Sequence, residues 1–268
     1  MSSYQVLSMM ASLMRGNDEY EILARGVFVR ESVDLLFRED RLRFPEAEGR
    51  FIQAQYVRTQ SQIPAIFDGA LTHVRSFSAS DGHLYLDCQR SSYVEYVGTD
   101  NTEYVKRFGR KRVVNPLSCG AILKTSDQEL IYGCRRALGS GKVTYGLPAG
   151  FVNPDSDRSS NLVDPFLTMQ RELEEEIGIL RSEIQRMQCL GLLGREGTHM
   201  VFLTEVAPTS RDTKHRLPRE SELERLESIE VKSITKFLEL NHDRILPHSL
   251  GGIVLYDAYR RDLLRFDA

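Results

Sequence analysis

Three glutamates near the middle of the chain have the spacing of a metal-binding helix face. Glu172, Glu175 and Glu176 stand at positions i, i+3 and i+4, so on a helix their carboxylates share one side. Carboxylates this close repel each other, and the arrangement becomes favourable when a divalent cation lies among them. Hard oxygen ligands suit Mg²⁺ or Mn²⁺, and Mg²⁺ usually binds together with a substrate's phosphates. A solvated, glutamate-rich helix face is the alternative interpretation of the same run.

The neighbouring residues indicate how such a helix would be oriented and where it would end. Leu173 and Ile177 are four residues apart on the opposite side, which predicts that this side faces a core. Asp164 and Pro165 are typical of an N-cap and a first helical residue. Gly178 is typical of the left-handed residue that follows a helix. The pattern therefore predicts a helix with acids on one face and apolar residues on the other.

The order of residues over 171–179 (RELEEEIGI) resembles the second half of the Nudix box, and 147–150 (LPAG) resembles its entry. The protein is therefore similar to the Nudix hydrolase superfamily. It departs from the pattern in two places. Twenty residues lie between Gly150 and Arg171, seven more than in the family pattern, and the family's first glutamate falls on Val163. The added residues are expected to be the polar ones over 155–161, which would form a loop that bulges into water.

The resemblance implies roles for the residues of the box. Glu172, Glu175 and Glu176 would bind one or more Mg²⁺ or Mn²⁺ ions together with the carbonyl of Ala149. Arg171, four residues before Glu175, would orient that carboxylate as part of the catalytic group. A surface ion pair has the same geometry and is the alternative for Arg171.

Residues outside the acidic face are weaker candidates, and for each of them a position on the surface is the alternative. A glutamate outside the box is expected to act as base or further ligand, and the candidates are Glu205, Glu222 and Glu224. The candidates for substrate binding are Gly150, Tyr145 and Lys142, and Tyr145, Phe151 and Tyr93 are candidates to stack against a base.

The predicted elements divide the chain into two parts. Residues 1–112 are expected to form a small α+β module, with helices over 4–14 and 31–37 and a hairpin whose strands cover 70–77 and 83–88. Residues 113–268 are expected to form the second domain, with strands over 116–123, 130–134, 143–145, 188–193, 200–206 and 229–231 and helices over 233–240 and 249–264. For this domain the resemblance implies an α/β/α sandwich with a mixed sheet.

The resemblance implies metal-dependent hydrolysis of a nucleoside diphosphate linked to another moiety. Segments 66–70 and 93–100 resemble the UDP-glucose/UDP-galactose pyrophosphatase subgroup, which implies cleavage of a UDP-sugar to UMP and sugar 1-phosphate. ADP-ribose, dinucleotides and capped nucleotides are alternatives, although the signature positions of the ADP-ribose and diadenosine polyphosphate subgroups fall on Gly194 and Glu196 and do not match.

Two alternatives change the reaction itself. One is a Nudix module that binds nucleotides without cleaving them, in which the glutamates are usually lost. The other is isomerisation of isopentenyl diphosphate, which would need a catalytic cysteine, and Cys119 and Cys134 are the candidates.

The composition is typical of a soluble globular protein and limits the kinds of partner it would bind. The 268 residues are 41% hydrophobic and 27% charged, as in soluble globular proteins, and no apolar stretch approaches the length of a membrane span. The net charge of -3 argues against nucleic acid as a partner but allows one small phosphorylated ligand. Four cysteines without a CxxC pair predict reduced thiols in the cytoplasm. The oligomeric state is left open.

Overall fold

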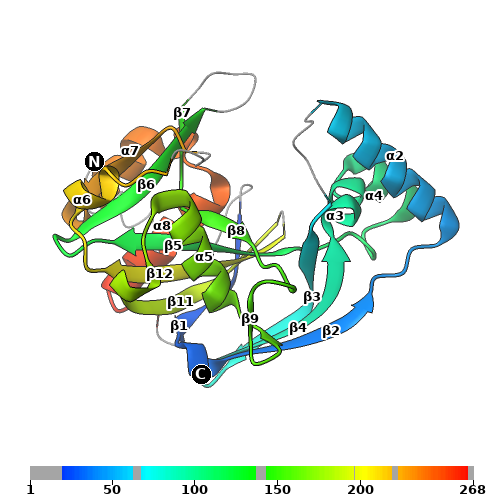
Figure 1. Cartoon of the computed structure of the whole chain (residues 1–268), viewed down its shortest axis with the longest axis horizontal. Coiled ribbons are helices and arrows are strands. Elements are labelled where there is room, and N and C mark those ends of the chain that lie inside the picture. The colour runs from blue at the N-terminus through cyan, green and yellow to red at the C-terminus, as the bar shows by residue number, and fades with distance from the viewer. Residues whose placement is uncertain (1–19, 63–67, 137–142, 196, 219–222, 265–268) are drawn as a thin grey trace.

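The computed structural model describes residues 20–62, 68–136, 143–195, 197–218 and 223–264. The helix predicted over 4–14 lies outside these residues. In the described part the chain forms two halves, each built on its own sheet (Figure 1). A third, two-stranded sheet of β9 (Arg158–Ser159) and β10 (Leu162–Val163) forms a hairpin within the loop between β8 and α5. No helix of the described part is long and apolar enough to cross a membrane.

The larger half is built on an eight-stranded mixed sheet. Its main path runs β1-β11-β12-β5-β6-β13, β7 pairs with β6, and β8 pairs with β5. Strands β12 and β5 are parallel, whereas the other pairs are antiparallel. The strands are β1 (Glu21–Phe28), β5 (Leu117–Lys124), β6 (Glu129–Arg136), β7 (Val143–Gly146), β8 (Ala149–Phe151), β11 (Ile184–Gly194), β12 (Thr198–Val206) and β13 (Arg225–Glu230).

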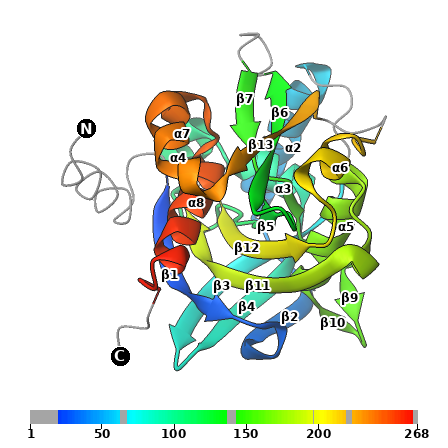
Figure 2. The ribbon, with the colours of Figure 1, turned by 90° about the vertical axis from the view of Figure 1, so that its left-hand side faces the viewer.

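Helices cover both faces of this sheet, and each face has its own core. Under α5 (Pro165–Ile177) the buried residues include Met169 and Leu173, and under α8 (Pro247–Arg260) they include Ile253 and Leu255. Figure 2 shows α5 and α8 on opposite sides of the sheet. The α/β/α sandwich with a mixed sheet is thereby confirmed. The remaining helical segments of this half are α6 (Ser210–Lys214), α7 (Ile234–Asn241), η2 (Arg181–Glu183), η3 (Val231–Ser233) and η4 (His242–Arg244).

The smaller half combines a three-stranded sheet with three helices. The sheet order is β2-β4-β3, from β2 (Val33–Arg41), β3 (Ala70–Ser80) and β4 (His83–Ser92). The helices are α2 (Glu46–Gln62), α3 (Tyr93–Thr99) and α4 (Thr102–Phe108). Phe51, Ile52 and Tyr104 form a small core between the helices. The predicted hairpin is confirmed, and its turn uses positive φ at Asp81 and Gly82.

Two predictions about this part of the chain need correction. The helix expected over 31–37 is wrong, because after the short turn η1 (Arg30–Ser32) the chain enters β2. There Val33, Leu35 and Phe37 alternate with more exposed residues, which is the period of a strand. The division at residue 112 assigns β1 to the first module, whereas β1 pairs with β11 in the larger sheet. The division into two domains otherwise stays a prediction.

Hydrogen bonds and ion pairs join the two halves close to the segment between β8 and α5. The N–H of Thr72 on β3 donates to the carbonyl of Val152, and Arg90 on β4 binds Asp155 at 2.6 Å. Arg30 makes an ion pair with Asp164, the residue that precedes α5. The smaller half is therefore attached to the loop that leads into the acidic helix.

Candidate active site

Helix α5 begins and ends where the local signals predict. The side chain of Asp164 accepts a hydrogen bond from the N–H of Phe166 at 2.9 Å, and Pro165 occupies the first turn. At the other end Gly178 is left-handed, with φ 76° and ψ 24°. Burial of Leu173 and Ile177 in the core sets the rotation of the helix.

Strand β8 lies directly against the acidic side of α5. A Cβ atom at Gly150 would stand 1.9 Å from Oε1 of Glu172, so only glycine allows this carboxylate its position. The N–H of Ala149 donates to Oε2 of Glu176 at 3.0 Å. On its other edge β8 pairs with β5, where Gly150 faces Cys119. The backbone of β8 is thus fixed between a sheet strand and two of the predicted metal ligands.

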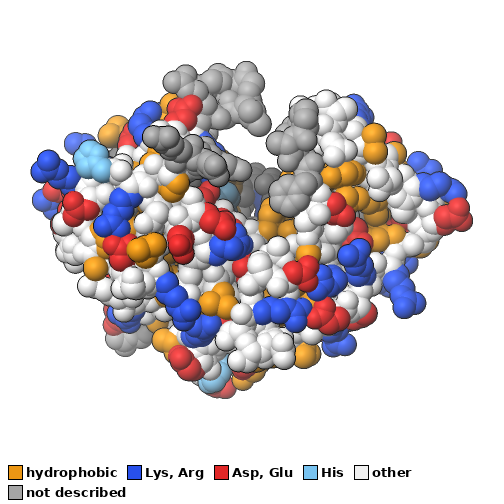
Figure 3. Space-filling model, in the orientation of Figure 1, with side chains coloured by type: hydrophobic (Ala, Val, Ile, Leu, Met, Phe, Trp, Pro, Cys, Tyr) orange, Lys and Arg blue, Asp and Glu red, His pale blue; other side chains and the backbone are white. Residues whose placement is uncertain are grey.

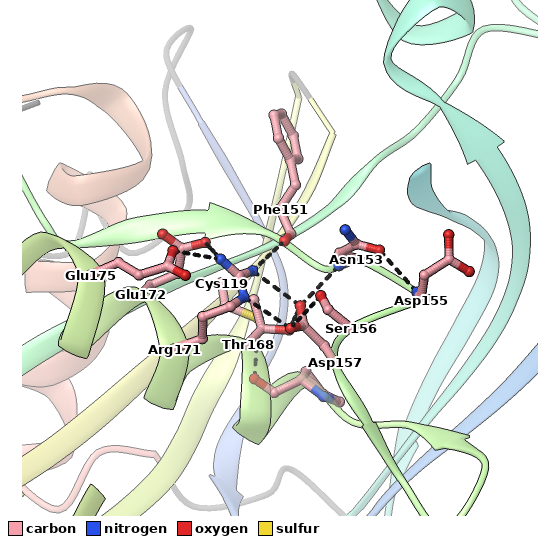
Figure 4. Close-up of polar contacts among 11 residues, drawn as sticks. Cys119, Phe151, Asn153, Asp155, Ser156, Asp157, Thr168, Arg171, Glu172 and Glu175 are labelled. Carbon is pink, nitrogen blue, oxygen red and sulfur yellow. Dashed lines mark hydrogen bonds and ion pairs between the residues drawn. The ribbon is translucent and has the colours of Figure 1, made fainter. Parts of the chain in front are cut away.

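Arg171 brings two of the three carboxylates to one point. Its Nη1 atom lies 2.7 Å from Oε1 of Glu172 and 3.0 Å from Oε2 of Glu175 (Figure 4). Since both oxygens contact the same nitrogen, they converge around a single positive group. The predicted contact between Arg171 and Glu175 is present. Glu176 faces β8 and lies 3.8 Å from Nη2 of Arg135.

Asp157 holds Arg171 from the other side. Its carboxylate accepts from Nε of Arg171 at 2.9 Å and from Nη2 at 3.1 Å. It also accepts from the Thr168 hydroxyl at 2.8 Å and from the Asn153 N–H at 2.9 Å. The side chain of Asp157 is only 2% exposed. This residue belongs to the segment expected to bulge into water, and that expectation is wrong for Asp157.

The pKa values of Glu172 and Asp157 are shifted in opposite directions. Burial raises the pKa of Glu172, and the nearby Arg171 offsets only part of this effect. Burial alone would also raise the pKa of Asp157, but hydrogen bonds from Arg171, Asn153 and Thr168 outweigh it and leave this pKa lowered. Asp157 is therefore the ionised partner that keeps Arg171 in place at neutral pH.

The donor set at this face fits a divalent cation. Within the described residues, no three His, Cys, Asp or Glu side chains form a ready-made metal cluster. Glu172 and Glu175 nevertheless converge on a cationic nitrogen, and Glu176 follows on the same face of α5. A set of carboxylate oxygens suits Mg²⁺ or Mn²⁺. The predicted contribution of the Ala149 carbonyl stays a prediction, since the contact found here uses the Ala149 N–H.

The other predicted glutamates lie elsewhere or outside the described residues. Glu205 makes an ion pair with Lys124 at 3.0 Å and pairs with it in the register of β12 and β5. Lys124 stands four residues beyond Gly120, the residue of β5 that pairs with Ala149. Glu205 is therefore displaced along the sheet from Ala149. Glu224 is exposed just before β13, and its N–H donates to the carbonyl of Cys134. Glu222 is not among the described residues.

The residues predicted to bind substrate do not all lie at the acidic face. Tyr145 is buried on the α7 and α8 side of the sheet, against Phe237 and beneath the Arg244 guanidinium. It therefore lies on the face opposite to α5. Gly150 contacts Glu172, as described above. Lys142 lies outside the described residues.

Both candidate cysteines for an isomerase are core residues. Cys119 is fully buried beneath α5, its Sγ lies 3.6 Å from the Pro165 carbonyl, and burial raises the pKa of the thiol well above its ordinary value. Cys134 is buried in the other core, and burial raises its pKa to about 12. Neither thiol is placed to exchange protons with a substrate, so the isomerase alternative loses its support.

Comparison with known proteins returns structural likeness at low sequence identity. No family model matches the chain, and no curated protein does. A NUDIX hydrolase from Nitrosomonas europaea is 17% identical with a TM-score of 0.36, covering 57% of this chain and 96% of that one. An ADP compounds hydrolase is 15% identical with a TM-score of 0.41, covering 75% and 95%.

A third structure, a Nudix hydrolase from M. smegmatis, is 12% identical with a TM-score of 0.38 and covers 56% of this chain and 89% of that one. Two of these three structures carry the name Nudix hydrolase. The description of the fold and of the site rests on this chain's own residues.

Proposed function

We propose that this protein is a metal-dependent hydrolase that cleaves a nucleoside diphosphate linked to another moiety. One observation carries the proposal: Glu172 and Glu175 converge on Nη1 of Arg171 directly beside the glycine-containing strand β8. A bound Mg²⁺ or Mn²⁺ would supply charge neutralisation on the diphosphate oxygens. Glu172, Glu175 and Glu176 are the residues that would hold it.

The remaining contacts prepare these carboxylates for that role. Arg171 binds Asp157 through Nε and Nη2 and uses Nη1 for the two glutamates. Its hold on Asp157 therefore persists when the glutamates turn to a cation. Glu176 is tied to the backbone of β8 at Ala149. Fixed positions of this kind reduce the reorganisation needed when the substrate's phosphates arrive.

Water must also lose a proton for hydrolysis to proceed. Among the glutamates outside the box, Glu224 is exposed at the start of β13, next to the strand that carries Arg135. Glu205 is engaged by Lys124. Glu205 and Glu224 both stay candidates for this base, together with Glu222.

The substrate that we favour is a UDP-sugar, cleaved to UMP and sugar 1-phosphate. This choice rests on the resemblance of segments 66–70 and 93–100 to the UDP-glucose/UDP-galactose pyrophosphatase subgroup. Hydrolysis of ADP-ribose, a dinucleotide or a capped nucleotide would keep the reaction and change the substrate. Non-catalytic nucleotide binding is less favoured, because all three glutamates are present.

The test is hydrolysis of a substrate panel, first with Mg²⁺ and then with Mn²⁺. The panel contains UDP-glucose, UDP-galactose, ADP-ribose, NADH, diadenosine polyphosphates and capped nucleotides, with phosphate release coupled to a phosphatase. We expect UDP-sugars to be cleaved, and Glu175→Gln to lower turnover at least about 100-fold while Glu174→Gln, an exposed neighbour, retains it. Cleavage of another panel member would change the assigned substrate and leave the proposed reaction unchanged. Equal turnover by Glu175→Gln, or no metal-dependent hydrolysis, would contradict the proposal.

A further inference from the structure

Five basic side chains gather at the end of α4 and in the turn that follows this helix. The stretch 104–115 (YVKRFGRKRVVN) contains them and has no Asp or Glu. We call these residues the basic cluster, and all of them are exposed: Lys106, Arg107, Arg110, Lys111 and Arg112. Figure 2 shows α4 on the side of the molecule away from α5. The basic cluster is therefore separate from the acidic face that the proposed reaction uses.

Gly109 ends α4 and brings the two parts of the basic cluster together. Its φ of 82° is positive, which favours glycine at the point where the helix stops. Just beyond it, the N–H of Val113 donates to the carbonyl of Arg110 at 3.2 Å and closes a turn. The cations of the helix and those of the turn therefore belong to one compact segment.

Two contacts with α2 fix the basic cluster on the smaller half. The guanidinium carbon of Arg107 lies 5.9 Å from the centroid of the Phe51 ring. Nη1 of Arg112 lies 2.7 Å from Oε1 of Glu48, a buried carboxylate that also accepts from the Tyr104 hydroxyl at 2.8 Å. Arg112 is therefore neutralised by a carboxylate, whereas Arg107 is held by an aromatic ring and keeps its charge for another partner.

The rest of the basic cluster forms a local excess of positive charge. No ion pair within the described residues joins a carboxylate to the other four cations, Lys106, Arg107, Arg110 and Lys111. Segments 41–62 and 93–115, which contain the helices of the smaller half, hold nine Lys and Arg against five Asp and Glu, whereas the whole chain holds 35 against 38. On the face shown in Figure 3, by contrast, basic and acidic side chains are interspersed. The net charge therefore conceals a positive surface, and local charge determines which polyanions a protein attracts.

The side chains of this stretch suit a row of phosphates better than a membrane or an unstacked base. Three of the five cations are arginines, whose planar guanidinium groups bind phosphate oxygens in pairs. The apolar side chains over 104–114 are buried or half-buried, so none is offered for insertion into a lipid surface. The rings of Phe51, Tyr104 and Phe108 pack on one another with centroids 5.2, 5.6 and 5.9 Å apart, so they are engaged within the small core and not presented to bases. Contact with a phosphate backbone whose bases are already stacked, as in a duplex, needs only the cations.

We propose that the basic cluster binds the sugar-phosphate backbone of a nucleic-acid duplex. This inference goes beyond the proposed function, because it concerns a second surface and does not depend on diphosphate hydrolysis. Contacts between cations and phosphates carry little sequence information, so binding is independent of base sequence and weakens as the salt concentration rises. The expectation against nucleic acid rested on the net charge of the whole chain, and it does not extend to this local surface.

A solvated helix end is the competing explanation of the basic cluster. Under that explanation the cations contact only water and small ions, and the acidic net charge of -3 keeps duplexes away from the protein. A binding surface instead predicts a salt-dependent affinity that resides in these residues and not in other exposed cations. The two explanations therefore separate when equal numbers of cations are removed from the basic cluster and from elsewhere.

The test is fluorescence anisotropy of labelled RNA and DNA duplexes of about 20 base pairs, titrated with the full-length protein over a range of salt concentrations. If about four phosphates are contacted, affinity should fall roughly 100-fold between about 50 and 200 mM salt. The triple variant Arg107→Gln, Arg110→Gln, Lys111→Gln should lower the slope of log Kd against log salt by about three. This variant retains Arg112, so the contact with Glu48 is kept.

The control is a second triple variant, Arg181→Gln, Arg186→Gln, Arg211→Gln, which removes the same charge from exposed positions of the larger half. Because these cations lie outside the basic cluster, the control should keep the affinity and the salt slope of the wild type. Circular dichroism of both triple variants checks that they remain folded.

Each outcome decides the inference. Absence of duplex binding by the wild type at low salt overturns it, and this result needs no variant. Equal losses in the two triple variants also overturn it, since overall charge would then explain the binding. Binding to vesicles of phosphatidylcholine and phosphatidylserine without binding to either duplex would overturn it in favour of a lipid surface. A loss confined to the variant of the basic cluster supports it, and comparison of the RNA and DNA duplexes then shows which backbone is preferred.

Discussion

At the scale of single residues, Asp157 and Arg171 are the pair on which the acidic face depends. Arg171 carries one positive charge and contacts three carboxylates, those of Asp157, Glu172 and Glu175. Asp157 is the most buried of these three carboxylates, and it also receives bonds from Asn153 and Thr168. The position that the family pattern gives to its first glutamate is taken by Val163, which is buried in the core. The longer loop therefore supplies the acid that fixes Arg171.

Asp157→Asn should lower both stability and turnover. The amide keeps the shape of the side chain but removes the charge that balances a half-buried guanidinium, which we expect to cost about 1.5–3 kcal/mol in the free energy of unfolding. Turnover should fall because Arg171 no longer holds the two glutamates. Urea unfolding and diphosphate hydrolysis measure the two effects. The control is Asp155→Asn, because the Asp155 side chain is 59% exposed. Equal losses of stability and turnover in the two variants would contradict the special role of Asp157.

The same pair predicts a pH dependence of stability. Folding lowers the pKa of Asp157 below its usual value of about 3.8, so its contribution is complete above that value and is lost as the pH falls through the lower folded pKa. The difference in unfolding free energy between wild type and Asp157→Asn should therefore be full at pH 6 and shrink below about pH 4. Urea titrations at several pH values give this difference. A difference that stays constant down to pH 2.5 would contradict the account.

At the scale of elements, local sequence signals predict helix α5 but do not predict the contacts of the loop before it. The cap at Asp164, the glycine at Gly178 and the buried Leu173 could all be predicted, because each acts within a few residues. The contact between Asp157 and Arg171 spans 14 residues, and no periodic pattern marks it. The departure from the family pattern at Val163 marked this part of the box as unusual, but it did not indicate which residue contacts Arg171.

Strand β2 is a second case in which a distant partner determines the structure and the local pattern does not. Its apolar residues over 33–37 are too few to distinguish the helical period from the strand period, and pairing with β4 decides the outcome. The membership of β1 in the larger sheet also depends on a distant partner, β11. Sequence analysis therefore predicts which segments form elements better than it predicts which sheet they join.

Gly150→Ala tests the close packing of β8 on α5. The added methyl group would overlap Oε1 of Glu172, so the carboxylate must move, and we expect turnover to fall about 100-fold. The matched control is Gly49→Ala, where nothing lies within 4 Å of the added atom. Since Gly49 lies within α2, that control should raise the unfolding free energy by up to about 1 kcal/mol and leave hydrolysis unchanged. Full turnover in Gly150→Ala would show that Glu172 is not needed in this position.

At the scale of the whole molecule, the smaller half is connected to the acidic helix through the longer loop. Arg90 is 15% exposed and binds both Asp155 of the loop and Glu39 of β2. Arg158, also in the loop, binds Glu39 as well. These contacts give the loop a fixed place between the two halves. A loop expected to be solvated is instead part of the contact between the larger and the smaller half.

Arg90→Met should loosen this connection without unfolding either core. We expect faster hydrogen exchange of the amides over 153–164, because the ion pair between Arg90 and Asp155 of the loop is lost, together with the ion pair that joins Arg90 to Glu39 of β2. Mass spectrometry of exchange in the intact protein measures this change. The control is Arg50→Met, whose side chain is 71% exposed and pairs only locally with Glu46. Unchanged exchange in Arg90→Met would mean that the other contacts of the loop, such as the ion pair between Arg158 and Glu39, suffice to position it.

The central claim, that the acidic face of α5 binds the divalent cation, is tested most directly by titration of Mn²⁺ followed by electron paramagnetic resonance, in the presence of UDP. The wild type and Glu174→Gln should bind Mn²⁺ alike, and binding should tighten when UDP is present, since the diphosphate supplies further oxygen ligands. The triple variant Glu172→Gln, Glu175→Gln, Glu176→Gln should lose this binding while remaining folded. Undiminished Mn²⁺ binding by the folded triple variant would contradict the account.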